Sequence, residues 1–528
     1  MGETIGEILR EQARTRPETV AIVDSRGSTG RRLTYAQLER EVAVAAGWLQ
    51  SHGLRKGDAV LVFVPMSADL YVALLAMFRL GVVALFLDPS AGRQHIEQCC
   101  ARWAPDALLA IPRAHLLRLR SAALRRIPLK IVTSGWVPRA ARWLAGGVDV
   151  NADAGAGDEI EPADAALVTF TSGSTGVPKA AVRTHGFLVA QHRVLEPGIV
   201  LEPGEVDLAT LPIFTLANLA SGVTTVIPDV DLRRPGNVDA ARLRQQIERF
   251  GVTRITASPA FFERLIEHGG TKNRTLPTLR KLHTGGAPVF PRMLSGLRTL
   301  APNAHVVAVY GSTEAEPIAH LAVGEITPEE LVAMQNGRGL LTGAPVAEIT
   351  LRVIRDRWGT PRGVMTEREL VDETLPPGEA GEIVVTGEHV LRGYLGGMGD
   401  EETKFRVDGT VWHRTGDAGL LDSGGRLWLL GRCAARIDDG HGRFHPFAVE
   451  CVAMNFPEVR RAALLAHGGK RWLVVEARGD RHALEAQLLA ATRWAHIGEV
   501  RFVETMPVDK RHNAKVDYPG LRRMLGIE

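Results

Sequence analysis

The chain has 528 residues, of which 45% are hydrophobic and 23% charged, with a formal net charge of +3. This length predicts at least two domains with an ample apolar core, and neither the balanced charge nor any motif suggests a nucleic-acid partner. Four cysteines without a CxxC pair, no signal-like segment in the first 20 residues and no uninterrupted apolar span predict a cytoplasmic protein without a transmembrane segment.

Helices and apolar strands alternate through the first 310 residues. Helical spacing of apolar residues and suitable N-caps predict helices that begin near residues 5, 34, 67 and 239. Apolar, β-branched runs predict strands at 58–64, 82–87, 224–228 and 306–310. This alternation indicates an α/β fold with parallel sheets that are covered by helices on both faces.

Residues 114–143 are rich in basic side chains, namely Arg118, Arg120, Arg125, Arg126, Lys130, Arg139 and Arg142. One interpretation is a docking surface for an acidic partner protein or an anionic membrane. The more ordinary interpretation is a solvated helix face. The sequence leaves both open.

A loop rich in glycine and hydroxyl residues follows the apolar strand at 165–168. Residues 169–179 read Thr-Phe-Thr-Ser-Gly-Ser-Thr-Gly-Val-Pro-Lys. Gly173 and Gly176 allow backbone amides to turn toward one point, and the hydroxyl groups and Lys179 can complete a cradle for a polyphosphate. The spacing differs from a Walker loop, and Ala180 stands where a magnesium-binding Ser or Thr would follow the lysine.

In the last third of the chain, the regular alternation of helices and apolar strands ends. After residue 351, short strands separated by glycine turns predict a β-rich subregion. A polar, glycine-containing stretch begins at Gly431, and the remainder suits a small α+β domain. We therefore predict a large N-terminal domain at 1–431 and a small, mobile C-terminal domain at 432–528.

Further motifs follow the loop in a set order. They are His-Thr-Gly-Gly-Ala-Pro at 283–288, Tyr-Gly-Ser-Thr-Glu at 310–314, Thr-Gly-Asp at 415–417, Gly-Arg at 431–432 and Asn-Ala-Lys at 513–515. Together with the loop, they resemble the motifs of the acyl-adenylate-forming superfamily, which includes acyl- and aryl-CoA ligases, firefly luciferase and nonribosomal adenylation domains. The resemblance covers about residues 5–525, and it implies that the large domain is an AMP-binding adenylation domain and the small one a lid.

The resemblance implies a site for ATP and Mg²⁺. The ATP-binding residues that it implies are Thr171, Ser172, Gly173, Ser174, Thr175, Gly176, Lys179, Gly285, Gly286, Ala287, Tyr310, Gly311, Thr313, Asp417 and Arg432. Glu314 resembles the magnesium ligand, Thr313 the contact to the α-phosphate and Asp417 the acceptor for the ribose hydroxyls. Lys515 resembles the lid lysine that bridges the acid and the α-phosphate after domain closure. With Lys179, Thr313 and Glu314 it makes up the expected catalytic set, whereas His185, His283 and His512 are expected to be structural or exposed.

The acid pocket is expected around residues 211–218. Phe214, Leu216, Ala217 and Asn218 are the candidate lining residues, and their apolar character favours a hydrophobic acyl chain over an amino acid. The strings at 202–208, 224–229, 247–252 and 507–515 resemble the β-lactone synthetases of bacterial olefin biosynthesis. In that branch a β-hydroxy acid is adenylated, and its own hydroxyl then displaces AMP to close a lactone.

Several residues depart from the pattern of typical CoA ligases. Ala434 occupies the position that we align with the acidic hinge residue, and Asp438 and Asp439 follow where a basic loop is usual. Two carboxylates near an anionic CoA would repel it, which disfavours thioester formation. Glu316 either faces the acyl pocket or is a solvent-facing carboxylate.

Two other functions remain as alternatives. One is a fatty-acyl- or aryl-CoA ligase, or a ligase that loads an acidic acyl carrier protein, for which the arginines of 114–143 would be suited. The other is a non-catalytic nucleotide sensor. Retention of Lys179, Thr313, Glu314, Asp417 and Lys515 argues against the sensor.

Overall fold

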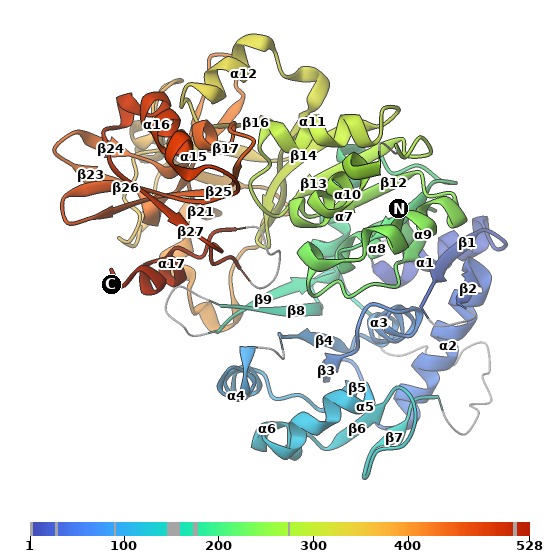
Figure 1. Ribbon diagram of the computed structural model, residues 1–528. Coiled ribbons are helices and arrows are strands. Elements are labelled where there is room, and N and C mark those ends of the chain that lie inside the picture. Colours follow the sequence, from blue (N-terminus) through green and yellow to red (C-terminus); the bar gives the residue numbers. More distant parts are fainter. Residues whose placement is uncertain are drawn as a thin grey trace. The chain divides into compact units, whose positions relative to one another are not determined.

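A computed structural model describes residues 4–26, 30–88, 91–144, 159–172, 178–272, 275–509 and 515–527 (Figure 1). The chain forms two compact units. The first contains residues 1–229 together with 391–400, and the second contains 230–390 together with 401–528. These units do not test the predicted boundary between residues 431 and 432, which stays a prediction.

The first unit contains a largely parallel sheet with the order β7-β6-β5-β3-β4-β8-β9, in which only β9 runs antiparallel to its neighbour. The strands are β3 (Ala59–Phe63), β4 (Val83–Phe86), β5 (Ala107–Ala110), β6 (Leu129–Val132), β7 (Ala141–Arg142), β8 (Ala165–Ser172) and β9 (Pro178–Thr184). The helices between them are α3 (Ala68–Leu80), α4 (Arg93–Arg102), α5 (Pro112–His115) and α6 (Ala122–Arg126).

Strand β3 shows that this sheet is covered on both faces. Val60 and Val62 pack in one apolar cluster with α3 and α2 (Tyr35–Ser51), whereas Leu61 and Phe63 pack in a second cluster with α4 and α6. Successive residues of a strand point to opposite faces, so each cluster covers one face of the sheet. The predicted parallel sheet with helices on both faces is confirmed.

A second sheet of this unit has the order β10-β11-β1-β2. Its strands are β1 (Val20–Asp24), β2 (Arg31–Thr34), β10 (Val206–Ala209) and β11 (Thr224–Ile227). Helices α1 (Ile5–Thr15), α7 (His185–Gly198) and α8 (Pro212–Ala220) belong to the same unit. Thr4 and Glu7 close a capping box at the start of α1, and the predicted cap Thr34 does the same for α2 with Gln37.

The second unit contains three parallel strands followed by antiparallel ones, in the order β12-β13-β14-β15-β16-β22-β21-β19-β17. The strands are β12 (Arg254–Ala257), β13 (Lys281–Gly285), β14 (His305–Ser312), β15 (Ala315–Ala322), β16 (Leu340–Pro345), β17 (Thr350–Ile354), β19 (Gly381–Thr386), β21 (Thr410–Leu421) and β22 (Leu427–Arg432). The parallel strands alternate with α9 (Ala240–Phe250), α10 (Pro259–Lys272) and α11 (Pro291–Leu300). The β-rich subregion predicted after residue 351 is confirmed.

The last hundred residues form a small α+β arrangement, as expected. A hairpin of β23 (Ile437–Asp439) and β24 (Gly442–Phe444) precedes a sheet of β25 (Val459–His467), β26 (Lys470–Ala477) and β27 (Ile497–Val503). The helices are α15 (Pro446–Ala453), α16 (Arg481–Ala491) and α17 (Tyr518–Leu525). None of the helices in the described ranges combines the length and apolar character needed to cross a bilayer.

Candidate active site

The predicted adenine slot begins where β13 ends beside β14. Gly285 is paired with Val309, and a Cβ added at Gly285 would lie 2.5 Å from the Val309 carbonyl oxygen. A larger residue would force the two strands apart, so the close approach requires glycine. Gly286 has φ of +79°, and it turns the chain out of the strand toward Ala287. The result is a backbone edge without side-chain bulk, which suits a flat ligand.

Tyr310, Asp417 and Arg432 meet within the second unit, although Tyr310 precedes the other two by more than 100 residues. The Tyr310 hydroxyl donates to Oδ2 of Asp417 at 2.8 Å, and Nη1 of Arg432 lies 3.3 Å from Oδ1 of the same carboxylate. The register of β21 against β22 places Asp417 directly opposite Arg432. Arg432 also donates to the Thr415 carbonyl at 3.0 Å. The three predicted contacts to the nucleoside are therefore assembled around one carboxylate.

The carboxylate of Asp417 shifts the pKa values of both of its neighbours, Tyr310 and Arg432. Burial and the neighbouring carboxylate of Asp417 raise the pKa of Tyr310 well above its ordinary value, so its hydroxyl remains a donor at neutral pH. The same carboxylate raises the pKa of Arg432. Because Tyr310 and Arg432 each approach a different oxygen, the carboxylate is held in one orientation while lone pairs remain for further donors.

Glu314 lies in the tight turn between β14 and β15. Its backbone amide donates to the Ser312 hydroxyl at 3.3 Å, and its side chain is half-buried. Gly311 precedes this turn, and a Cβ there would lie 3.0 Å from the Ala315 carbonyl oxygen. Burial lowers the pKa of His413 to about 3 although the Glu314 carboxylate opposes this change, which makes the two side chains electrostatic neighbours.

The donor atoms at this turn fit a magnesium ion. Thr313 and Glu314 offer a hydroxyl and a carboxylate side by side, and oxygen donors of this kind are the ligands that Mg²⁺ prefers. The described residues contain no cluster of three or more His, Cys, Asp or Glu side chains that could hold a metal by themselves. A single protein carboxylate with nucleotide phosphates and water as further ligands is the usual arrangement for Mg²⁺ at ATP.

Lys179 is buried in the first unit at the start of β9. Its ammonium lies over the ring of Tyr394, 5.7 Å from the ring centroid. Gly399 packs on the aliphatic stem, because a Cβ there would lie 2.6 Å from Cδ of Lys179. Segment 391–400 belongs to this unit and thus holds the lysine from one side. The aromatic face and the packed stem limit the positions that the ammonium can take.

The phosphate loop itself is only partly described. Thr171 and Ser172 end β8, where they pair with Lys179 and Pro178 of β9. This pairing places Lys179 at the mouth of the predicted loop. Gly173, Ser174, Thr175 and Gly176 lie outside the described residues, and their predicted contacts to phosphate stay predictions.

Lys515 is held by its backbone. Its amide donates to the Asp509 carboxylate at 2.9 Å, and its carbonyl accepts from the Asp509 amide at 2.8 Å. Asp509 therefore positions the chain where the predicted lid lysine begins. The preceding Asn513 and the candidate structural residue His512 lie outside the described residues.

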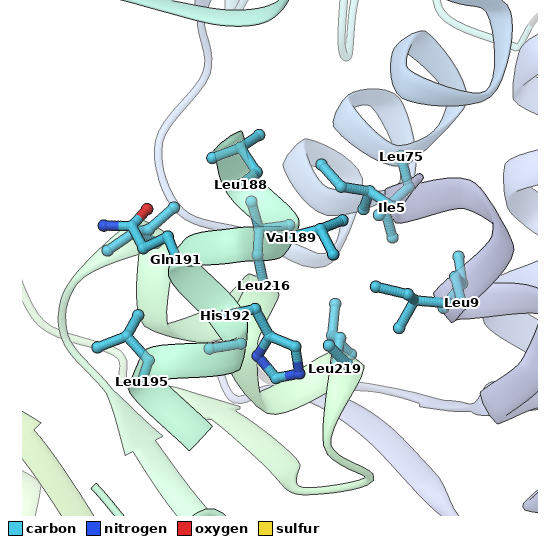
Figure 2. A pocket seen from close by; sticks show the side chains of 14 residues that line it. Ile5, Leu9, Leu75, Leu188, Val189, Gln191, His192, Leu195, Leu216 and Leu219 are labelled. Carbon is cyan, nitrogen blue, oxygen red and sulfur yellow. The ribbon is translucent and has the colours of Figure 1, made fainter. Parts of the chain in front are cut away.

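An apolar pocket lies between α1, α3, α7 and α8 (Figure 2). Leu216 and Ala217, two of the predicted acyl-pocket residues, line it together with residues such as Leu9, Leu75 and Leu188. His192 also faces the pocket. Burial lowers the pKa of His192, and its ring nitrogens have no hydrogen-bond partner among the described residues. The pocket is thus lined mainly by hydrocarbon, with the imidazole of His192 and the amide of Gln191 as its polar side chains.

The other two predicted acyl-pocket residues do not line this pocket. Phe214 is buried on α8, and the side-chain amide of Asn218 donates to Oδ2 of Asp207 at 2.6 Å and to Oγ1 of Thr225 at 3.2 Å. A buried amide with these partners ties α8 to β10 and β11. Asn218 thus has a structural role that its sequence position did not reveal.

The two carboxylates that were expected to repel CoA are both paired with arginines. Asp438 accepts from Arg436 at 3.1 Å and from Arg443 at 2.8 Å. Asp439 accepts from Arg471 at 2.6 Å. Each carboxylate has a guanidinium partner, so this hairpin carries no excess of negative charge that would exclude CoA.

Two of the histidines that the sequence predicts to be structural or exposed are buried. His185 and His283 are fully buried, and neither has a hydrogen-bond partner for its ring nitrogens in the described part of the chain. Burial lowers the pKa of His185 to about 4 and that of His283 well below its ordinary value. Both rings are therefore neutral at pH 7. Glu316 is half-buried on β15, which does not separate its two interpretations.

The sequence did not single out Tyr394 or His413. Tyr394 lies 215 residues after Lys179, and neither its neighbours Arg392 and Gly393 nor its spacing indicates a contact with the loop lysine. His413 precedes the Thr-Gly-Asp motif by two residues on β21. Its place beside Glu314 depends on the order of strands, which the local sequence does not contain.

Comparisons with known proteins show the family of this chain. The AMP-binding enzyme family matches residues 9–395. Olefin beta-lactone synthetases from Stenotrophomonas maltophilia (strain K279a) and Xanthomonas campestris pv. campestris are each 35% identical to this chain, covering 96% and 97% of it and 95% of each relative. A feruloyl-CoA synthase from an Amycolatopsis species is 27% identical over 89% of this chain and 88% of its own length.

The fold is shared with solved structures as well. The amide bond synthetase from Marinactinospora thermotolerans superposes with a TM-score of 0.79 at 22% sequence identity, with 98% of this chain and 99% of the other covered. The family match spans most of the chain, and the olefin beta-lactone synthetases are similar along nearly its full length. The chain belongs to the AMP-binding enzyme family, and it is an AMP-forming acid ligase.

Proposed function

We propose that this ligase activates a hydrophobic β-hydroxy acid as an acyl-adenylate and then closes it to a β-lactone. The observation that carries the first step is the group of Tyr310, Asp417 and Arg432, which presents an oriented carboxylate to a nucleoside. Similarity to two olefin beta-lactone synthetases over nearly the whole chain supports the second step. A cytoplasmic location, as expected from the sequence, is part of this proposal.

In the first step the carboxylate of the acid displaces pyrophosphate from ATP. A carboxylate oxygen of the acid attacks the α-phosphorus, a new oxygen–phosphorus bond forms, and the bond to the β-phosphate oxygen breaks to release pyrophosphate. Lys515 and Thr313 would stabilise charge at the α-phosphate, and Lys179 would hold the outer phosphates. Asp417 would accept hydrogen bonds from the ribose hydroxyls, while Gly285, Gly286, Ala287 and Gly311 leave space for the base.

Magnesium would be held by Glu314 together with the phosphates. When bound, the ion neutralises charge that develops as pyrophosphate leaves. The protein's own contribution is to place one carboxylate and one hydroxyl on the rigid turn between β14 and β15. Replacement of Glu314 should therefore raise the Mg²⁺ concentration that the first step requires, while acid binding should change little.

In the second step the β-hydroxyl oxygen of the bound acyl group attacks the acyl carbonyl carbon. The carbon–oxygen bond to AMP breaks, AMP leaves, and the hydroxyl proton passes to solvent. Since nucleophile and carbonyl belong to one molecule, the pocket need only hold the chain in a bent conformation. The mainly apolar pocket that includes Leu216 and Ala217 is the candidate for this role.

Thioester formation is the second candidate function. The specific observation in its favour is that Asp438 and Asp439 are both paired with arginines, so the hairpin does not repel CoA. Similarity to a feruloyl-CoA synthase supports it at lower identity. An acidic acyl carrier protein in place of CoA belongs to the same alternative.

Product analysis separates the two functions. The purified enzyme is incubated with Mg²⁺-ATP and a long-chain β-hydroxy acid, with and without CoA, and products are followed by mass spectrometry. We expect AMP and a dehydrated product without CoA, and the carbonyl infrared band should identify it as a β-lactone rather than an unsaturated acid. The matched control is the same acid without the hydroxyl, which should form acyl-AMP but no lactone. A product that forms only with CoA would reject lactone closure and leave adenylation in place.

A further inference from the structure

Charge is distributed unevenly along this chain. Residues 107–143 contain eight Lys and Arg residues and no Asp or Glu, whereas the whole chain has a net charge of +3. The remainder of the protein is therefore net negative. This segment forms the edge of the first unit's sheet, where β5, β6 and β7 are adjacent to one another and to α5 and α6 (Figure 1).

Most of these cations face solvent. Arg113, Arg120, Arg126 and Arg139 are exposed, and none has an acidic partner within the described part of the chain. Arg118 and Arg125 instead donate to backbone carbonyls. The arginines are exposed, as the interpretation as a solvated helix face expects, but they do not lie on one helix. Short helices α5 and α6 are separated by a 3₁₀ turn at Leu116–Leu119, and β6 follows.

Three large apolar side chains protrude from the same surface. Leu116, Leu119 and Trp136 are 62%, 77% and 81% exposed. Among the described residues, only Val364 is a large hydrophobic residue with comparable exposure, at 79%. Single exposed leucines are common, but three such residues within 21 positions need an explanation.

Hydrogen bonds bring the apolar and basic residues together. Arg118, next to Leu119, donates to the Pro138 carbonyl at 3.3 Å and so joins the 3₁₀ turn to the loop that carries Trp136. Arg125 donates to the carbonyls of Arg118 and Leu119 at 3.1 and 3.2 Å and joins α6 to the same turn. Leu116, Leu119, Trp136 and the exposed arginines thus form one surface, called here the arginine–leucine–tryptophan surface.

We propose that the arginine–leucine–tryptophan surface docks the enzyme on an anionic lipid membrane. Protruding leucine and tryptophan side chains can enter the interface between headgroups and acyl chains, where tryptophan is especially stable. Arginines around them attract anionic headgroups. A hydrophobic acid, as proposed above, partitions into bilayers, so docking would bring the enzyme to its substrate. The surface itself does not depend on that function.

Vesicle sedimentation tests the docking. The full-length protein is mixed with vesicles of phosphatidylcholine alone, or of phosphatidylcholine with about one third phosphatidylglycerol, and the sedimented fraction is measured. We expect binding to the anionic vesicles, little binding to the neutral ones, and a loss of binding in high salt because the Debye length shrinks from about 10 Å at 0.1 M to about 3 Å at 1 M.

Two variants examine the two components separately. One combines Arg113→Gln, Arg120→Gln and Arg126→Gln, and the other combines Leu116→Ser, Leu119→Ser and Trp136→Ser. A basic residue near an anionic surface contributes roughly fivefold to partitioning, so we expect the arginine variant to bind at least about tenfold more weakly. The leucine–tryptophan variant should lose binding to a similar extent.

Matched controls lie elsewhere in the chain. Val364→Ser removes an equally exposed apolar residue, and Arg523→Gln removes an exposed arginine, so neither should change vesicle binding. All variants should retain the thermal midpoint and ATP–pyrophosphate exchange with a short, water-soluble acid. This exchange assay also shows whether the proposed adenylation has failed independently of docking.

Three results would overturn the proposal. The first is a wild-type protein that does not sediment with anionic vesicles. The second is that both variants bind like the wild type. The third is that the wild-type protein does not bind vesicles but binds an acidic acyl carrier protein through the same arginines. This surface would then be a protein-docking site.

Discussion

At the scale of single residues, the chemistry of this ligase centres on carboxylates with defined partners. Asp417 is shared between Tyr310 and Arg432, and each partner takes a different oxygen. Tyr310 donates a hydrogen bond and Arg432 forms an ion pair, so the carboxylate still has lone pairs that can accept from a ligand. Lys179 has a different environment, because its ammonium lies over the ring of Tyr394 and its aliphatic stem packs against Gly399.

Replacement of Asp417 should affect nucleotide use more than folding. Asp417→Asn keeps the size of the side chain but turns an NH₂ group toward one of two donors. Hydrogen bonds to charged groups contribute about 1.5–3 kcal/mol, so we expect kcat/KM for ATP to fall by about 10- to 100-fold in ATP–pyrophosphate exchange. Asp231→Asn, at an exposed ion pair with Arg233, is the matched control. Equal activity of the Asp417 variant would exclude ribose recognition by this residue.

The aromatic ring of Tyr394 should support ATP use through its cation–π contact with Lys179. Tyr394→Leu removes the aromatic surface beneath the Lys179 ammonium, whereas Tyr394→Phe retains it. A cation–π contact of this kind is worth about 0.5–2 kcal/mol. We expect kcat/KM for ATP to fall about three- to tenfold in the leucine variant and to change less than twofold in the phenylalanine variant. Equal losses in both would point to the hydroxyl instead.

At the scale of elements, strand register explains what the sequence could and could not predict. The motifs identified Tyr310, Asp417 and Arg432 separately, but their meeting depends on the pairing of β21 with β22 and on the position of β14 in the same sheet. Local alternation of helices and strands was enough for the parallel sheets and for the small α+β part. It was not enough for Asp439, whose partner Arg471 lies 32 residues away on another strand.

Helix α15 carries a buried acid whose titration should affect stability. Burial raises the pKa of Glu450 to about 7, although the Tyr518 hydroxyl and the Leu464 amide donate to its carboxylate and act in the opposite direction. The folded state therefore holds this proton more tightly than the unfolded state, whose pKa is near 4.5. The stabilisation is complete below that value and is lost as pH rises through about 7.

Glu450→Gln should remove this pH dependence, since the amide oxygen can still accept from Tyr518. Between pH 5 and pH 8 we expect the wild type to lose on the order of 3 kcal/mol relative to the variant, measured as the difference in unfolding free energy or thermal midpoint. Comparison of the two proteins isolates this group from the buried histidines. Glu458→Gln, an exposed site, should follow the wild type. Parallel pH profiles of wild type and Glu450 variant would contradict the raised pKa.

At the scale of the whole molecule, the proposed mechanism needs motion of the C-terminal part. Two hydrogen bonds with Asp509 hold the backbone of Lys515 in place. The role proposed for Lys515 requires its side-chain ammonium to reach the α-phosphate. Lid closure of this kind commonly completes an active site and excludes water. A lid lysine that reaches the α-phosphate only after closure should contribute to chemistry and not to ATP binding, so a mutation can separate the two steps.

Lys515→Ala should separate them. Loss of a charge that stabilises the transition state commonly costs about 10²- to 10³-fold in rate, so we expect ATP–pyrophosphate exchange to fall by that amount. The dissociation constant for ATP should change by less than about threefold, because Asp417 and Lys179 remain. Lys470→Ala, on the β25–β26 hairpin, is the control for loss of a C-terminal lysine. Unchanged exchange in Lys515→Ala would exclude this lysine from the first step.

The one-sided arrangement of cations has a consequence for handling the protein. The sequence pI is near 8.7, so at about pH 9 the protein as a whole carries a slight negative charge. The arginines of residues 107–143 keep their charge at that pH, and a local field can act independently of net charge. The protein should therefore be retained on a cation-exchange column under conditions in which its isoelectric point predicts flow-through. Molecules bound in this way would share one orientation, with the β7 edge of the sheet against the resin.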